Sequence, residues 1–239
     1  MSTDSKTKSV SRKLLVWDLP TRLFHWLLML SIIGSWTTAE AGFDWTETHF
    51  LFGYFSLSLV IFRVTWGFVG PTHARFSAFI QRPTQTLLGV RQLFNRQPAK
   101  HVGHNPVGGL SVIVFLILVC LQATTGLFIS DDIFYAGPYN GVISSATAGT
   151  LAQIHHLNFT VLQVFIVIHL LAITWYALGK RSNLVRPMVT GKKLLAEHQQ
   201  QQSIASSQLL KAFVIAALTT MVIVSLVQLA PPPPVPDFF

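Results

Sequence analysis

The chain has 239 residues, of which 51% are hydrophobic and only 11% are charged. Its mean hydropathy is +0.50, whereas water-soluble domains usually carry about 25% charged residues. The composition therefore excludes an ordinary soluble domain and favours an integral membrane protein. The single cysteine, Cys120, excludes a disulfide framework and a thiolate metal cluster, and its apolar neighbours predict a small buried side chain.

The N-terminal segment, residues 1–19, is polar and basic. No short apolar region in it ends at a small-residue cleavage site, so we interpret it as a retained cytoplasmic tail and not as a signal peptide.

Five apolar segments are long enough to cross a bilayer, whose core of about 30 Å requires about 20 helical residues. Only helices or closed barrels satisfy the backbone there, so the sequence predicts an all-α integral membrane protein. The predicted helices cover residues 20–39, 46–68, 106–129, 151–178 and 209–229.

The loop between the second and third segments contains the string TQTLLGVRQLFNRQ. The spacing of Leu87, Leu88, Arg91 and Phe94 suggests a short amphipathic helix on the membrane surface. An ordinary solvated loop explains the same residues, and both interpretations remain open.

The basic residues predict the orientation. Every Lys and Arg except Arg63 lies in the first 22 residues, in the 69–105 loop or in the 179–211 loop, which share one side of the membrane. The positive-inside rule therefore places the N-terminus in the cytoplasm and the C-terminus outside. The net charge of +8 reflects this topology and contact with anionic lipid, and we expect no nucleic-acid partner. The opposite side is acidic, with Glu40, Asp44, Glu47, Asp131 and Asp132.

The fourth segment carries three histidines, in the string IHHLNFTVLQVFIVIHLL at residues 154–171. Ionisable side chains within a membrane are costly and usually functional, and neutral imidazole is a common ligand of haem iron. His155 and His169 are 14 residues apart, which is a rise of about 21 Å with an angular offset of roughly 40°. They share a helix face but cannot share a metal ion. His156 is offset from His169 by roughly 140° and is the weaker candidate.

Each of these two histidines has a candidate mate at a similar depth on another helix. His49 and His155 both lie about 6 Å inside the outer ends of their segments, and we expect them to form one pair. His25 lies near the inner start of the first segment. His169 lies about 9 Å from an aromatic belt expected at its inner end. These two form the second pair, and two such pairs stacked across a bilayer predict a path for single electrons.

Other polar and small residues have two interpretations each. Arg63 is a candidate for an ion pair with a propionate of an inner haem, or for contact with lipid phosphate. His104 is a candidate contact for a propionate or a quinone, or else a solvated loop residue. Gly34 and Gly53 make room for a macrocycle, or for close helix packing. The inner aromatic belt is predicted at Trp175 and Tyr176.

Strings spread over residues 14–180 resemble the bacterial cytochrome b561 and nickel–iron hydrogenase b-type cytochrome family. They are VWDLPTRLFHWLL, HFLFGY, RVTWGFVGPTHARFSAF, GHNPVGGLSV, LQATTGLFISDDI and HHLNFTVLQVFIVIH. The resemblance implies a four-helix bundle with two haem b groups, ligated by residues that correspond to His25, His49, His155 and His169. It also implies quinone-linked electron transfer across the bacterial inner membrane, with a periplasmic c-type cytochrome or another redox subunit as partner.

The fifth helix and the terminal string APPPPVPDFF lie outside that four-helix core. The predicted organisation is a cytoplasmic tail at 1–19, a dihaem domain at 20–180, a cytoplasmic linker at 181–208, and a fifth helix with a Pro-rich periplasmic tail at 209–239. The fifth helix is a candidate for packing a homodimer, holding a partner subunit or anchoring the tail.

The same haem sites fit several functions. The first is electron transfer between the quinone pool and a periplasmic carrier. The alternatives are the anchor subunit of a hydrogenase or dehydrogenase complex, a self-contained superoxide or ferric reductase, and a non-haem metal transporter. The last is disfavoured because the predicted helix cores have no acidic residue to join the histidines around a metal ion.

Overall fold

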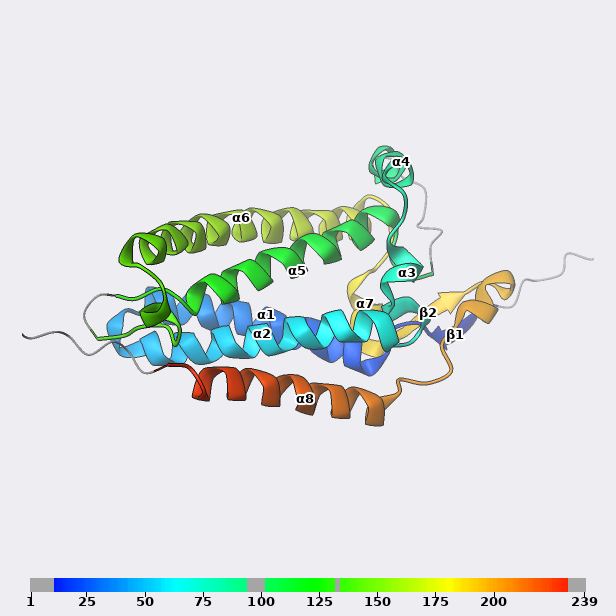
Figure 1. The fold of residues 1–239 in the computed structure, drawn as a ribbon. Helices are drawn as coiled ribbons and strands as arrows, with labels where there is room; N and C mark the ends of the chain where they lie inside the picture. Colours follow the sequence, from blue (N-terminus) through cyan, green and yellow to red (C-terminus); the bar gives the residue numbers. More distant parts are fainter. Residues whose placement is uncertain (1–10, 94–101, 132–133, 232–239) are drawn as a thin grey trace, which may run out of the picture.

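The computed structural model describes residues 11–93, 102–131 and 134–231 (Figure 1). Five long helices run along one common axis, and four of them start close to their predicted positions. The exception is α6, which starts at Ser145 and not at residue 151. The bounds are α1 Leu19–Glu40, α2 Thr46–Val69, α5 Pro106–Gly126, α6 Ser145–Leu178 and α8 Leu209–Gln228.

Capping side chains explain where three of these helices begin. The Asp18 carboxylate accepts from the Thr21 amide at 2.8 Å at the start of α1. Asn105 accepts from the Gly108 amide at 2.6 Å at the start of α5, where a proline occupies the first turn. Ser144 caps α6 in the same way, so this helix extends through a polar turn that hydropathy alone does not include.

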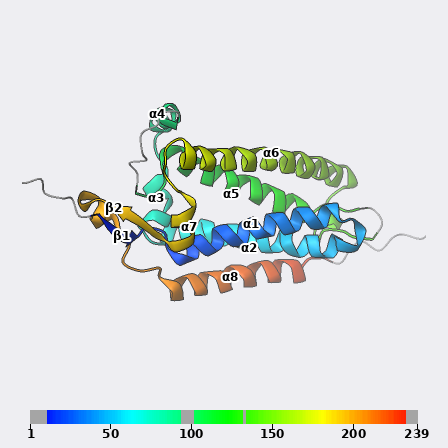
Figure 2. The same cartoon turned by 180° about the vertical axis from the view of Figure 1, so that it is seen from behind.

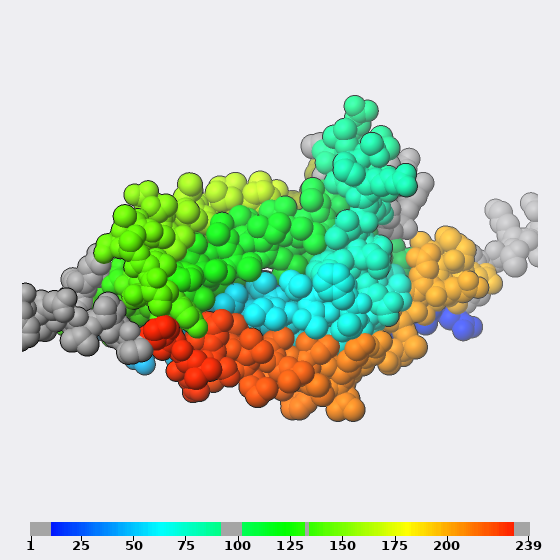
Figure 3. Space-filling view, viewed as in Figure 1, coloured from blue at the N-terminus to red at the C-terminus, as the bar shows by residue number. Residues whose placement is uncertain are grey.

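The helices form two antiparallel pairs and one flanking helix. α1 packs along α2, α5 packs along α6, and α2 also contacts α5. α8 lies along α2, as Figures 2 and 3 show. The main apolar core joins these elements and comprises Phe24, Leu59, Val60, Phe62, Trp66, Ala74, Leu116, Val119, Leu162 and Ala212.

Four helical stretches of the described chain are long and apolar enough to cross a membrane: Phe43–Val69, Pro106–Gly126, Ser145–Leu178 and Leu209–Gln228. Large apolar side chains such as Leu171 and Phe213 are exposed along them, as expected for contact with lipid. The chain is therefore a multi-pass membrane protein. α1 is less apolar than these four, so its crossing, the fifth predicted, remains a prediction, supported by its packing along α2.

A small cap closes one end of the bundle, which we call the inner end because its segments are basic. Here β1 (Arg12–Leu15) pairs antiparallel with β2 (Lys192–Leu195). Val16, Val102 and Leu195 form a separate small core beneath them. The sequence predicted an unpaired tail and linker at these positions, because four-residue strands so far apart in the chain leave no detectable pattern. The helices α7 (Val185–Thr190) and η4 (Glu197–Gln202) adjoin this sheet.

The 69–105 loop contains more helix than expected. The predicted surface helix is present as α4 (Pro83–Leu93), and Phe94 lies outside the described residues. Before it come η2 (Thr72–Ala74) and the one-turn helix α3 (Phe76–Phe79). At the opposite, outer end, the connections contain η1 (Phe43–Trp45) and η3 (Asn140–Val142).

Two side-chain predictions are wrong. Tyr176 is only 6% exposed and accepts a hydrogen bond from the Asn105 side chain, so it faces the protein and not the lipid boundary. Cys120 is exposed on α5, because it lies on the side of that helix turned away from the bundle.

Candidate functional site

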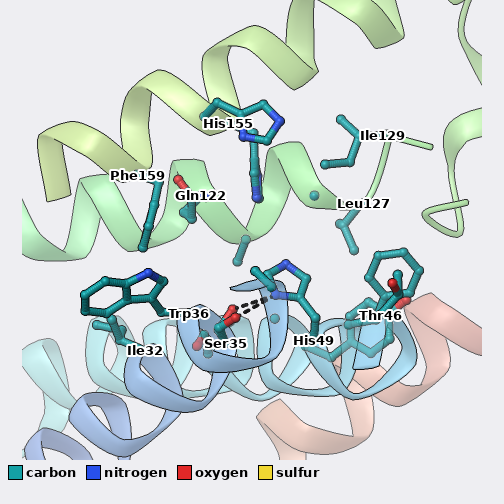
Figure 4. Close-up of a pocket in the computed structure, with 18 of the residues that line it drawn as sticks. Ile32, Ser35, Trp36, Thr46, His49, Gln122, Leu127, Ile129, His155 and Phe159 are labelled. Atoms are coloured by element: carbon teal, nitrogen blue, oxygen red, sulfur yellow. Dashed lines mark hydrogen bonds between the residues drawn. The ribbon is translucent and has the colours of Figure 1, made fainter. Parts of the chain in front are cut away.

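At the outer end, one histidine from α2 faces one from α6. The ring centroids of His49 and His155 are 6.4 Å apart and their planes differ by 70°. Figure 4 shows the two rings on opposite sides of a pocket. An imidazole–metal bond of about 2 Å on each side of one ion places two ring centroids roughly 6 to 6.5 Å apart. The observed separation therefore fits axial ligation of a single metal ion.

The outward-facing nitrogens of these two rings are already bonded to protein. His49 Nδ1 lies 2.9 Å from the Ser35 carbonyl oxygen, which can only accept, so Nδ1 carries the proton. His155 Nδ1 lies 3.0 Å from Thr125 Oγ1. The Thr125 hydroxyl itself donates to the helix carbonyl of Leu121 at 2.8 Å, so it accepts from the ring. Both Nε2 atoms are left as free ligands, which is the usual arrangement around metal-bound histidine.

The pocket between the two rings has a volume of about 380 Å³ and a mostly apolar lining. This size is within the range of about 300–1,000 Å³ typical of small-molecule and cofactor sites. Gly53 lines it, and a Cβ added there would meet nothing within 4 Å. The side chains come from α1, α2, α5, α6 and the loop after α5, so a planar group would lie between the two helix pairs.

At the inner end, the second pair comes from α1 and α6. The ring centroids of His25 and His169 are also 6.4 Å apart, with planes 49° apart. His25 Nδ1 is buried and has no hydrogen-bond partner among the described residues. Phe115 lies beside the pair, with its ring 5.6 Å from that of His169.

A buried polar cluster lies at the same end of the bundle as this inner pair. Arg63 is only 1% exposed, and its guanidinium lies 5.3 Å from the Phe76 ring and 5.9 Å from the Phe79 ring. Its Nη1 has no hydrogen-bond partner within the described ranges. Burying a cation is costly unless an anion or acceptor compensates it. The unpaired nitrogen therefore points to an anionic group that fits here.

Asp18 belongs to this cluster and was missed as a site residue. It is fully buried and accepts from Thr21 Oγ1 at 2.8 Å and from Trp66 Nε1 at 3.0 Å. The carboxylate also interacts electrostatically with Arg63. An Asp shortly before a proline is a helix-start signal that could have predicted its cap, but no sequence signal could have predicted its contact with α2.

His104 is not a solvated loop residue. Its ring lies 4.5 Å from that of Trp17 and 4.8 Å from that of Phe79, measured between centroids. Burial, followed by the nearby charges of Arg63 and His73, lowers the pKa of His104 to about 3. The ring is therefore neutral at physiological pH. Its Nδ1 is buried and lacks a partner in the part of the chain that the structure describes.

The structure thus brings together both predicted histidine pairs, and it places Arg63 and His104 at the inner end. His156 is exposed on α6, with its ring 6.0 Å from that of His155 and perpendicular to it. No group of three or more His, Cys, Asp or Glu side chains that could hold a metal ion occurs among the described residues. Each pair on its own could supply two protein ligands, which is the number that a porphyrin iron needs because the macrocycle supplies the rest.

A family model described as prokaryotic cytochrome b561 matches residues 16–191, about three quarters of the chain. The chain belongs to this family. It is therefore a membrane b-type cytochrome, whose group is haem b, and the paired histidines fit that group. The match ends before α8, so the last helix lies outside the family region.

Similar proteins include three bacterial chains named "Probable Ni/Fe-hydrogenase B-type cytochrome subunit". The one from Rhizobium leguminosarum bv. viciae is 24% identical, covering 80% of this chain and 94% of the relative. Those from Azotobacter chroococcum mcd 1 and Cupriavidus necator are 24% and 23% identical, covering 76% and 74% of this chain and 89% and 85% of the relatives. No solved structure matches the chain.

Proposed function

We propose that the chain carries electrons across the bacterial inner membrane through two haem b groups, between the quinone pool and a periplasmic redox partner. The observation that supports this most strongly is the pair of histidine couples, each with ring centroids 6.4 Å apart. His49 and His155 would hold one group, and His25 and His169 the other. Haem iron with both axial positions filled by imidazole exchanges single electrons and has no open position for a substrate.

The neighbouring residues would orient the histidine ligands and neutralise the charge of a haem propionate. Ser35 and Thr125 fix the proton of the outer ligands on Nδ1 and so direct Nε2 inward. Arg63 would pair with a propionate of the inner haem, since its Nη1 is buried without a partner among the described residues. His104 would contact a propionate or a quinone head group from its place between Trp17 and Phe79.

The partner at the outer end would be a basic soluble carrier such as a c-type cytochrome. The outer connections carry acidic residues and no Lys or Arg, and complementary charge speeds docking. Electron transfer to such a carrier should therefore slow as the salt concentration rises. Rates that do not change with salt concentration for any carrier tried would count against this partner.

A second candidate is the membrane subunit of a nickel–iron hydrogenase complex. The observation that favours it is the printed name of the relatives, which align with 74–80% of this chain. The haem sites would be unchanged, but the electrons would come from a large catalytic subunit. Purification in mild detergent separates the two candidates, because only the second predicts a stoichiometric hydrogenase partner.

The direct test is haem quantitation on the purified chain. Reduced-minus-oxidised spectra with pyridine haemochrome analysis should give two haem b per chain. His155→Ala and His169→Ala should each lose one, from different sites, and His156→Ala should retain both. A colourless protein, or one haem at full loading, would refute the proposal. Loss of a haem in His156→Ala but not in His155→Ala would reassign the outer ligand.

A further inference from the structure

The surface helix α4 lies across the bundle instead of along it. Figures 1 and 2 show its axis turned away from the common direction of the long helices, and Figure 3 shows it projecting from the inner end. It is attached through Gly89, where an added Cβ would lie 3.2 Å from Pro106 Cβ and 3.4 Å from Val107 Cγ2. Pro106 begins the membrane-spanning α5. α4 is therefore held at the level where the chain enters the bilayer.

The exposed side of α4 carries apolar side chains, with Arg91 beside them. Leu87 is 63% exposed and Val90 is 39% exposed, and residues three apart share one face of a helix. Gln85 lies roughly 160° around the helix from Leu87, so the two represent different sides. Ile80, just before the helix, is also exposed. Because α4 is held where α5 enters the bilayer, an apolar face here is suited to the boundary between head groups and acyl chains.

The charges around this face have one sign. Arg82 and Arg91 are exposed at the two ends of α4. Residues 69–105 contain no Asp or Glu at all. Basic residues beside an apolar helix face attract anionic lipid head groups, by about 1 kcal/mol for each residue near the surface.

We propose that α4 is an interfacial helix that inserts Leu87 and Val90 among the acyl chains and binds anionic phospholipid phosphates through Arg82 and Arg91. The binding site is thus a lipid site on the outside of the bundle, separate from both histidine pairs. The attachment through Gly89 fixes its height, and the crosswise axis allows its whole length to contact one leaflet.

The test uses the full-length protein with Cys120→Ser, to which Leu87→Cys or the matched control Gln85→Cys is added. Each variant is placed in nanodiscs of phosphatidylcholine alone or mixed with phosphatidylglycerol. The rate of modification by a membrane-impermeant maleimide is then divided by the rate in denaturing detergent. With phosphatidylglycerol present, we expect Leu87→Cys to react at least tenfold more slowly than Gln85→Cys, with a smaller difference in phosphatidylcholine alone.

Adding Arg82→Gln and Arg91→Gln should reduce the protection at position 87 to its value in phosphatidylcholine alone. Unprotected rates at both position 85 and position 87 in every lipid would overturn the proposal, since the helix would then be solvated all round. Equal protection at position 87 with and without phosphatidylglycerol would overturn the proposed binding of anionic lipid. Protection of both positions without lipid dependence would show instead that a protein surface covers α4.

Discussion

Arg63 is a buried cation that lies near two aromatic rings and interacts electrostatically with a buried carboxylate. Phe76 and Phe79 lie within 6 Å of its guanidinium, and Asp18 is held in place by Trp66 and Thr21. A positive charge near a haem favours the reduced form, because reduction removes one positive charge from the iron. We therefore expect Arg63 to raise the midpoint potential of the inner haem.

Arg63→Gln should lower the midpoint potential of one haem and leave the other unchanged. A unit charge about 10 Å away at an effective dielectric constant of about 20 is worth about 1.7 kcal/mol, or on the order of 70 mV for one electron. A spectroscopic redox titration measures the shift. Arg63→Lys keeps the charge and should remain near the wild-type potential, and Asp18→Asn should shift the same haem upward. Equal shifts in both haems would show a general structural effect instead.

The sequence predicted more of the geometry of the histidine pairs than of the inner polar cluster. His155 and His169 share a helix, so the helical repeat alone placed them on one face. Asp18, Arg63 and His104 come from a cap, a helix and a loop, and only the folded chain brings them near one another. Local spacing contains no information about such contacts.

The glycines within the helices differ in the space around their Cα atoms. A Cβ on Gly34 would lie 2.4 Å from the Phe52 ring, and one on Gly109 would lie 2.7 Å from the Phe79 carbonyl oxygen. These two glycines permit close packing between elements. Gly53 differs, because it lines the outer pocket and a Cβ there has open space. The sequence offered two interpretations for these glycines. Close helix packing holds for Gly34, whereas Gly53 leaves open space in the outer pocket.

Gly53→Leu should fill part of the outer pocket and reduce the haem content from two to about one per chain, while the helices still form. Haem quantitation together with circular dichroism measures both. Gly149→Leu is the matched control, since a Cβ there also meets nothing within 4 Å and Gly149 is not among the residues that line the pocket. Full haem content in Gly53→Leu would exclude this pocket as a haem site.

Helix boundaries were predictable where apolar composition and caps coincide. The third helix was predicted to begin at residue 106, and α5 begins at Pro106 with Asn105 as its cap. For α6 the cap and the start of the apolar segment lie at different residues, because a polar turn follows the Ser144 cap. Hydropathy detects the part of a helix suited to lipid, whereas hydrogen bonding decides where the helix begins. The predicted depth of His155 was therefore measured from the wrong residue, although its pairing with His49 does not depend on that start.

Basic residues are concentrated at one end of the molecule. β1, β2, α3 and α4 all lie at one end of the bundle (Figure 1). The stretches that contain them, residues 1–22, 69–105 and 179–211, hold every Lys and Arg except Arg63. The end of α8 lies at the other. By the positive-inside rule we expect the basic end in the cytoplasm, with α8 returning the C-terminus to the periplasm.

Reporter fusions test this topology and the crossing by α8. Alkaline phosphatase, which is active only outside the cytoplasm, should be inactive when fused after residue 205 and active when fused after residue 239. A cytoplasmic fluorescent reporter at the same positions is the reciprocal control. The same sign at both positions would mean that α8 does not cross the membrane.

The antiparallel pairing of β1 with β2 also sets an order of assembly. Arg12 pairs with Leu195, so the first strand has no partner until residue 195 has been synthesised. By then α1, α2, α5 and α6 have all been synthesised. The cap at the inner end therefore forms only after the helices that carry both histidine pairs have been synthesised, so a prosthetic group can reach the inner pair before the cap closes.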